Sequence, residues 1–312
     1  MFYRYFPLWK TFFEALGWRV VVSEGLGKRG KLHYLEDSCL PMKLLVTHAI
    51  HLKEKAVDHL FIPRLVSLHR SYILCPKFRA APDVVRLALE GGISILDETI
   101  DLREREYSLP RSFLVIGRRL GASEKEARKA FQKAETFFHE FQKGWERRIN
   151  GLSTKELFDL ERRTPEEVED KPFRVALIGH PYNLFDPDIN KDILTYAKSL
   201  GMGLVTSEGL PEKEIERQVG GLSKEIYWSS GREIVGALFH FLTTGVDGIL
   251  FLTSFKCGID ALLQELIRRR LKRNEQASPP VLFLTLDEHS AREGWITRLE
   301  AFREVMEARK KG

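Results

Sequence analysis

Short apolar runs alternate with amphipathic stretches along most of the chain. Val57–Ile62 and Ile93–Leu96 are apolar runs of strand length, whereas the apolar positions from Pro41 to Glu54 recur at helical spacing. Strands that alternate with helices predict an α/β fold with mostly parallel sheets. We expect strands at 18–22, 57–62, 93–96, 173–178, 204–206, 226–228, 248–253 and 281–286, and helices at 6–16, 41–54, 82–90, 189–200, near 212, from 230 to a stop at 245, at 259–270 and at 297–308.

The pattern changes in the middle of the chain. Residues 109–150 carry two helical patterns and no strand, and the second opens with a capping box between Ser123 and Glu126. Residues 150–172 then lose periodicity and fill with charge. The 312 residues are about twice a common domain size. We therefore predict an N-terminal α/β domain with a helical extension at 1–150, a linker at 151–172 and a C-terminal α/β domain at 173–312.

Composition narrows the class of protein. The 49 basic and 44 acidic residues give a net charge of +5, an excess too small to indicate nucleic-acid binding. The basic run Arg268–Arg273 lies at the end of a predicted helix, where cations complement the helix dipole. No stretch approaches the roughly 20 apolar residues that cross a bilayer, and Met1–Phe13 does not have the pattern of a secretory signal. We expect a cytoplasmic protein that binds neither nucleic acid nor membrane.

Three cysteines are the first candidates for chemistry. Cys39, Cys75 and Cys257 each lie between a predicted strand and a predicted helix, and an odd number with no close pair argues against a disulfide framework. In Ser38–Lys43 the cysteine follows a cap residue and precedes Pro41, so its sulfur faces unpaired backbone N–H groups, which suit a thiolate. We hypothesise that the three hold one metal centre. The alternative is three unrelated buried thiols.

The donor set favours iron and sulfide over zinc. A structural zinc site usually has four ligands and a close C-x-x-C pair, whereas three thiolates suit a cubane cluster with one iron free of cysteine. Zinc held by two of the cysteines and His180 stays an alternative, since His180 follows a predicted strand. Lys77 is a source of positive charge or a solvated side chain, and His48 and His51 share one helix face. Gly25–Gly30 spells G-x-G-x-x-G, but no helical pattern follows, so we predict a turn-rich loop there.

Nearly the whole chain carries motifs that occur in one order in a known family. They are Tyr5–Gly17, Ser38–Lys43, Phe61–Arg64, Cys75–Phe78 with Pro82–Asp83, Gly179–Tyr182, Phe251–Phe255 with Cys257–Gly258, Asp287–Glu288 and Thr297–Phe302. On these residues the chain resembles the acyl-CoA dehydratase activase-related family. That family is similar to the iron–sulfur subunits of 2-hydroxyacyl-CoA dehydratases and to double-cubane cluster proteins. The family pattern starts with a strand before the aromatic helix, for which residues 1–4 leave little room, so we expect either an upstream start or a lost strand that exposes a sheet edge.

The resemblance implies a fold, a cofactor and a partner. It implies two Rossmann-like domains with a cluster site in the cleft between them, and a cluster of the [4Fe-4S] or double-cubane type. An ATP-hydrolysing activase would supply electrons one at a time. By motif, the implied cluster ligands are Cys39, Cys75 and Cys257; as cofactor-binding residues beside them we expect Pro76, Lys77, His180 and Ser254.

These inferences combine into one functional hypothesis with two rivals. The hypothesis is an iron–sulfur protein that accepts low-potential electrons from a separate activase and reduces or dehydrates a small molecule such as an acyl-CoA. The sequence contains no actin-like ATPase motif, so an activase partner is required, and a homodimer or heterodimer is compatible with this role. The rivals are a non-catalytic cluster-binding scaffold or electron relay in a larger complex, and a zinc-binding protein. No residue is assigned a catalytic role.

Overall fold

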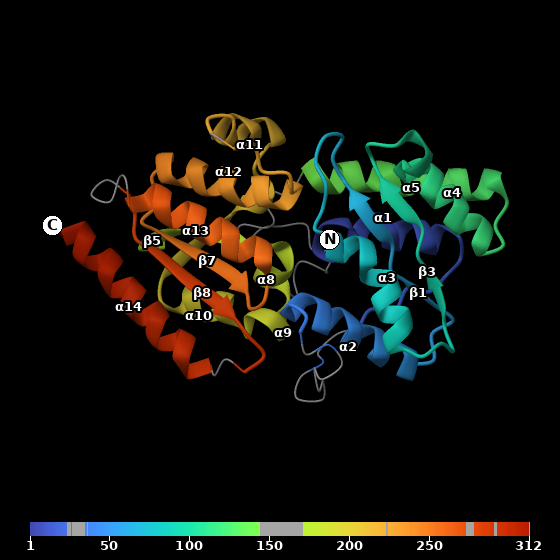
Figure 1. Cartoon of the computed structure of the whole chain (residues 1–312), viewed down its shortest axis with the longest axis horizontal. Helices are drawn as coiled ribbons and strands as arrows, with labels where there is room; N and C mark the ends of the chain where they lie inside the picture. The colour runs from blue at the N-terminus through green and yellow to red at the C-terminus, as the bar shows by residue number, and fades with distance from the viewer. Residues whose placement is uncertain are drawn as a thin grey trace. The chain divides into compact units, whose positions relative to one another are not determined.

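The computed structural model describes residues 1–23, 26, 35, 37–143, 171–222, 224–272, 278–289 and 292–311. Within them the chain is an α/β protein whose strand pairings are parallel, as predicted (Figure 1). The chain divides into two compact units, Met1–Lys143 with Tyr227–Ser229, and Gly144–Ile226 with Ser230–Gly312. The expected linker, apart from its last two residues, and the glycine loop, apart from Leu26, lie outside the described residues. Among the described helices, none combines the length and the apolar character that a membrane span needs.

Helices make up most of the first unit: α1 (Phe2–Ala15), α2 (Leu40–Glu54), α3 (Pro76–Ala88), η3 (Arg105–Tyr107), α4 (Leu109–Arg119) and α5 (Glu124–Lys143). Phe12 of α1 meets Phe113 of α4 edge to face, with ring centroids 4.7 Å apart. At Gly117 an added Cβ would lie 2.5 Å from the Ala127 Cβ of α5. The glycine lets α4 and α5 approach closely, and aromatic rings pack between α1 and α4. Both features stabilise this layer of helices.

Two short parallel ladders cross the first unit: β1 (His59–Phe61) with β3 (Ser94–Leu96), and β2 (Arg64–Ser67) with β4 (Thr99–Asp101). Pro63 lies between β1 and β2 and has no N–H to donate. The Ile62 N–H still reaches the Leu96 carbonyl at 3.1 Å, and the Arg64 N–H reaches the Glu98 carbonyl at 3.1 Å. The ladders are thus one strand pair that a proline interrupts.

Continuous apolar runs form the sheet of the second unit: β5 (Phe173–Gly179), β6 (Met202–Thr206), β7 (Gly248–Ser254) and β8 (Val281–Leu286). In the described residues the strands are parallel and lie in the order β6-β5-β7-β8. Every residue of β6 and β7 is buried, as strands without polar alternation require. Helices therefore have to cover both faces of this sheet.

The helices of the second unit are α8 (Pro181–Phe185), α9 (Pro187–Asn190), α10 (Ile193–Ser199), η4 (Ser207–Gly209), α11 (Glu212–Val219), α12 (Ser229–Thr243), α13 (Gly258–Lys272) and α14 (Arg292–Lys311). α10 is in contact with α14, and an added Cβ at Gly231 of α12 would touch Leu263 of α13. Figure 1 shows these two helix pairs on opposite sides of the sheet. The unit is thus a three-layer Rossmann-like arrangement.

The strand order creates a switch point between β5 and β7. From β5 the chain moves to β6 on one side, and it later returns to β7 on the other side. Gly179 and Leu252 are paired near the carboxyl ends of these two strands. In open parallel sheets, ligands bind beyond the carboxyl ends of the strands at such a point. The strand order alone therefore makes this edge the expected ligand-binding edge of the sheet.

Several predictions for the first unit were wrong in detail. Residues 18–22 do not form a strand, and none of their side chains is buried. The third helix begins at Pro76 rather than Pro82, which lies inside it. β2 and β4 were not predicted because both include polar residues (Arg64 and Ser67, Thr99 and Asp101) and do not form the apolar runs that marked β1 and β3. The capping box of Ser123 and Glu126 is confirmed, with Glu126 accepting the Ser123 N–H at 2.8 Å.

The second unit also departs from the sequence pattern. The helix expected at 189–200 is two helices, because Lys191 and Asp192 have positive φ angles of 48° and 64° between α9 and α10. The strand expected at 226–228 is a single bridge between Ile73 and Trp228, both of which belong to the first unit. The expected capping box at Ser230 is wrong, because α12 already begins at Ser229 and the buried Ser230 Oγ has no hydrogen-bond partner among the described residues.

Candidate functional site

The carboxyl ends of β5 and β7 bring two of the sequence candidates into one place. His180 directly follows β5, and Cys257 comes three residues after the end of β7 and directly before α13. Both therefore lie at the switch point of the second unit. Their separation by 77 positions in the sequence is closed by the pairing of adjacent strands.

His180 is held in place by the close approach of two strand backbones. An added Cβ at Gly179 would lie 2.5 Å from the Leu252 carbonyl oxygen of the neighbouring strand, so a side chain there has no room. The chain then turns into α8, where the His180 carbonyl accepts the Asn183 N–H at 2.8 Å. Pro181 suits the first helical turn because it has no N–H to satisfy. The His180 side chain is 5% exposed.

The turn after β7 sets the position of Cys257. Phe255 donates its N–H to the Leu286 carbonyl at 2.8 Å, and Lys256 has a φ of 60°, so the strand ends sharply. The Cys257 carbonyl accepts the Ala261 N–H at 3.1 Å, which makes the cysteine the cap of α13. Its Sγ accepts the Asp260 N–H at 3.5 Å. The half-buried sulfur therefore lies at a helix N-terminus, as the sequence predicts.

Asp260, in the first turn of α13, is the residue that sequence reasoning missed. Its side chain is 2% exposed, and its Oδ2 accepts the Ser254 N–H at 2.9 Å. Its Oδ1 lies 2.9 Å from His180 Nε2, which makes the two side chains an ion pair when the imidazole is protonated, and this oxygen has no hydrogen bond among the described residues. A buried carboxylate oxygen is costly unless a positive charge offsets it, so this atom calls for a protonated His180, a bound cation or a proton of its own.

Donor atoms of three residue types converge here. A ring nitrogen of His180, the Sγ of Cys257 and a carboxylate oxygen of Asp260 all lie within 4.8 Å of one another. Ligands bonded at about 2.0–2.3 Å to one tetrahedral ion are about 3.3–3.8 Å apart, so small side-chain rotations would close the set around an ion. The sequence signal was a C-x-x-D spacing at the start of a helix that follows an apolar strand.

Ser254 supports this edge through a buried hydrogen-bond pair. Its Oγ donates to Asn183 Oδ1 at 2.5 Å, and Asn183 Nδ2 donates to the Leu252 carbonyl at 3.2 Å. These bonds tie α8 to the end of β7. The Ser254 side chain, expected to bind a cofactor, thus uses its hydroxyl proton within the protein.

The other cysteines belong to the first unit and repeat the same local geometry. Cys39 is the N-cap residue of α2, with its carbonyl accepting the Met42 N–H at 3.0 Å. Cys75 is the N-cap residue of α3, with its carbonyl accepting the Phe78 N–H at 2.9 Å. Cys39 is buried, Cys75 is half-buried, and α2 and α3 are in contact. Each of the three cysteines thus directly precedes a helix.

The remaining candidates of the first unit have less specific surroundings. Pro76 is exposed and Lys77 is half-buried in the first turn of α3. His48 and His51 of α2 each place Nδ1 3.0 Å from the Ser23 hydroxyl. Both histidines therefore contact the same serine of the first unit.

Positive charge also lies at the carboxyl edge of the second sheet. Lys191 donates from Nζ to the carbonyls of Asp287 and Glu288, at 3.1 and 3.3 Å, in the loop after β8. Burial lowers the pKa of Lys191, against the opposing influence of the Asp287 carboxylate. The ammonium group therefore holds this loop to the start of α10.

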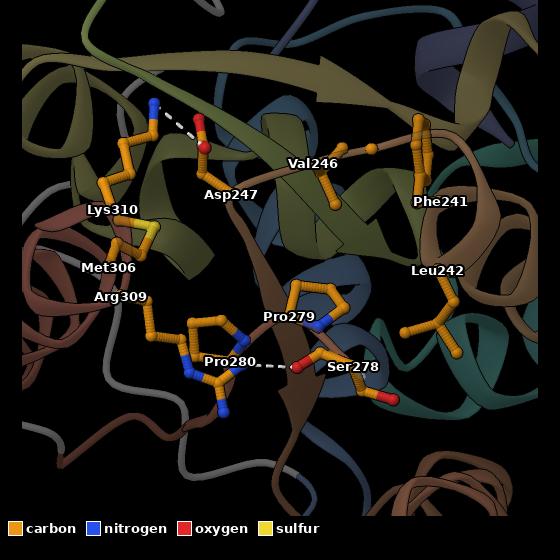
Figure 2. A pocket seen from close by; sticks show the side chains of 11 residues that line it. Phe241, Leu242, Val246, Asp247, Ser278, Pro279, Pro280, Met306, Arg309 and Lys310 are labelled. Atoms are coloured by element: carbon orange, nitrogen blue, oxygen red, sulfur yellow. Dashed lines mark hydrogen bonds and ion pairs between the residues drawn. The ribbon is translucent and has the colours of Figure 1, made fainter. Parts of the chain in front are cut away.

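A pocket lies at the opposite, amino edge of the same sheet (Figure 2). It has a volume of about 280 Å³ and is lined by residues from α12 and α14 and by the residues just before β7 and β8. Figure 2 shows Lys310 and Asp247 pointing toward each other, and their Nζ and Oδ1 atoms are 2.9 Å apart. Arg309 donates to the Ser278 carbonyl. Lys310 and Asp247 thus pair with each other, and Arg309 is bonded to a backbone carbonyl.

Comparison with known proteins gives a family. The sequence model of a family described as "CoA enzyme activase uncharacterised domain (DUF2229)" matches residues 1–210, about two thirds of the 312-residue chain. No curated protein sequence matches the chain. The matched region contains Cys39, Cys75 and His180, whereas Cys257 and Asp260 lie beyond it.

Proposed function

We propose that this chain, which belongs to the family of CoA enzyme activase domains, is an iron–sulfur protein that receives low-potential electrons from an ATP-hydrolysing activase. It would use them to reduce or dehydrate a small molecule such as an acyl-CoA. The family match supports a link to CoA enzymes. The proposal adds the cluster, the direction of electron flow and the substrate class.

One observation carries the proposal: the three cysteines occupy equivalent positions. Cys39, Cys75 and Cys257 each immediately precede the first residue of a helix. Backbone N–H groups at a helix start stabilise negative charge, and at Cys257 one of them reaches the sulfur itself. Iron–sulfur clusters are held by cysteine thiolates, so the donor chemistry fits the cofactor.

The residues near the cysteines would support such a cofactor. A cluster supplies one-electron transfer and, at an iron without a cysteine ligand, a place for an oxygen atom of the substrate. Lys77, two residues after Cys75, would offset the charge of the thiolates. Ser254 and Asn183 would hold the turn that carries Cys257, and His180 would bind beside it.

Anaerobic reconstitution tests the proposal. We expect about four iron and four sulfide ions per chain for a single cubane cluster, with an EPR signal after one-electron reduction. Cys39→Ser, Cys75→Ser and Cys257→Ser should each lower the iron content, whereas Ser38→Ala, next to Cys39, should not. Fewer than about two iron ions per reconstituted chain would contradict the proposal.

The family description favours a second candidate function. A domain of an activase could act as a scaffold or electron relay within the activase assembly, without a substrate of its own. Pull-down with the activase separates the two roles. Electron delivery predicts an association that depends on ATP, whereas a permanent relay predicts one that does not change when ATP is added or removed.

A further inference from the structure

We infer that the second unit contains a binding site for a single divalent cation of the zinc class, with His180, Cys257 and Asp260 as its protein ligands. This inference goes beyond the proposed function, because it needs neither Cys39 nor Cys75. It also assigns a role to Asp260. A cluster held only by cysteines would give this residue no role.

The geometry of Asp260 is the first argument. Most buried side-chain polar atoms have a hydrogen-bond partner. Here Oδ2 accepts a hydrogen bond from the Ser254 N–H, whereas the buried Oδ1 has no hydrogen bond among the described residues. It lies instead 2.9 Å from a nitrogen of His180, within the cluster that includes Cys257 Sγ, so the positive charge beside it is either a proton on the imidazole or a cation that all three residues share. A cation bound between the three donors would satisfy this oxygen.

The donor set is the second argument. Thiolate, imidazole and carboxylate are the ligand types of zinc, and sites with three protein ligands keep a fourth position for water or substrate. Both His180 and Asp260 are almost completely buried, so the side chains are already fixed and little conformational entropy is lost on binding. Mixed ligands of this kind suit Zn²⁺, Co²⁺ or Fe²⁺ better than Mg²⁺ or Ca²⁺, which prefer oxygen.

The location is the third argument. The three donors come from the ends of β5 and β7, which flank the switch point of the sheet. The site is therefore made within one unit by adjacent strands. Because Cys257 has one sulfur, we expect the single cation and a cysteine-held cluster to compete for it.

Cobalt binding tests the inference. Co²⁺ takes the place of Zn²⁺ and gives a thiolate charge-transfer absorption that reports a Co–S bond. We expect the metal-free full chain to bind one Co²⁺ with this absorption. The Cys39→Ser/Cys75→Ser double variant should bind it equally well. Cys257→Ser should lose the absorption, and His180→Gln and Asp260→Asn should weaken binding on the order of 100-fold, since even outer-sphere changes cost 10–100-fold.

The controls separate loss of a ligand from loss of structure. Asp260→Asn keeps an oxygen for the Ser254 N–H and changes only the atom that would bind the metal. Asp247→Asn makes the same chemical change at the other edge of the sheet and should leave Co²⁺ affinity unchanged. Circular dichroism of each metal-free variant checks folding. The inference is overturned if the folded wild-type chain does not bind Co²⁺, if the absorption requires Cys39 or Cys75, or if Asp260→Asn binds Co²⁺ as tightly as wild type. Failure of cluster reconstitution alone leaves it intact.

Discussion

The two edges of the sheet in the second unit use the same residue type in opposite ways. Asp247, just before β7, accepts the Arg174 N–H at 2.7 Å and pairs with Lys310 at 2.9 Å, so both carboxylate oxygens are engaged. Asp260, just after β7, has one engaged oxygen and one buried oxygen without a hydrogen bond. Both oxygens of Asp247 are therefore held by the fold, whereas Oδ1 of Asp260 lies among the possible ligand atoms of His180 and Cys257.

The largest expected effect is at Gly179, which shapes the carboxyl edge. Gly179→Ala puts a Cβ 2.5 Å from the Leu252 carbonyl and 3.1 Å from a Leu184 methyl group, and the backbone of the central strands cannot easily shift. We expect a loss of about 3 kcal/mol of unfolding free energy, measured by urea denaturation. Gly258→Ala is the matched control, because no heavy atom lies within 4 Å of its added Cβ. Equal stability of the two variants would show that the edge is not tightly packed.

Metal binding should stabilise the carboxyl edge. Zn²⁺ at 100 times its dissociation constant should raise the unfolding free energy by about 2.7 kcal/mol, and the gain should fall as the pH is lowered, because protons compete for Cys257 and His180. Thermal unfolding with and without Zn²⁺ measures this. Cys257→Ser should abolish the gain and Lys310→Met should retain it. A gain that survives Cys257→Ser would place the metal elsewhere.

A pair of alanine variants compares the two aspartates directly. Asp260→Ala leaves the buried Ser254 N–H without its acceptor, which should cost about 1–3 kcal/mol in the metal-free protein. Asp247→Ala exposes the Arg174 N–H to water, so its cost should be smaller. Urea denaturation of both variants gives the comparison. A greater loss of unfolding free energy in Asp247→Ala than in Asp260→Ala would contradict this expectation.

The smallest effect is expected at the amino-edge ion pair. The side chains of Lys310 and Asp247 are 47% and 25% exposed, so water and salt screen their attraction. Lys310→Met should therefore change the unfolding free energy by less than about 1 kcal/mol. The measurement is repeated in high salt, where wild type and variant should converge. A large change that persists in high salt would indicate that packing of the lysine stem, rather than charge, stabilises this edge.

Apolar periodicity predicted most elements, and local backbone geometry accounts for the failures. The strand at 248–253 and the helix at 41–54 were placed within one residue of β7 and α2. A strand buried on both faces gives a continuous apolar run, and a helix buried along one stripe gives apolar residues at helical spacing. The break at Lys191 and Asp192 was missed, since positive φ angles at non-glycine residues have no sequence signature. β4 was missed because two of its three residues, Thr99 and Asp101, are polar, whereas the equally short β3 lies in an apolar run.

The candidate site was only half visible in the sequence. Cys257 and His180 were singled out because each follows a predicted strand, and the structure brings both to the same edge. Asp260 was not, because an aspartate in the first turn of a helix is ordinary until its burial and its missing hydrogen bond are known. Strand order, which makes β5 and β7 neighbours, is a property of the fold and cannot be read from local pattern.

X-ray absorption at the metal edge of the anaerobically purified chain tests the central claim, that Cys257 is a metal ligand at the carboxyl edge. We predict sulfur scatterers at about 2.3 Å from the metal and a reduced sulfur contribution in Cys257→Ser. A chain that binds no metal, or a metal surrounded only by nitrogen and oxygen in both proteins, would contradict the account.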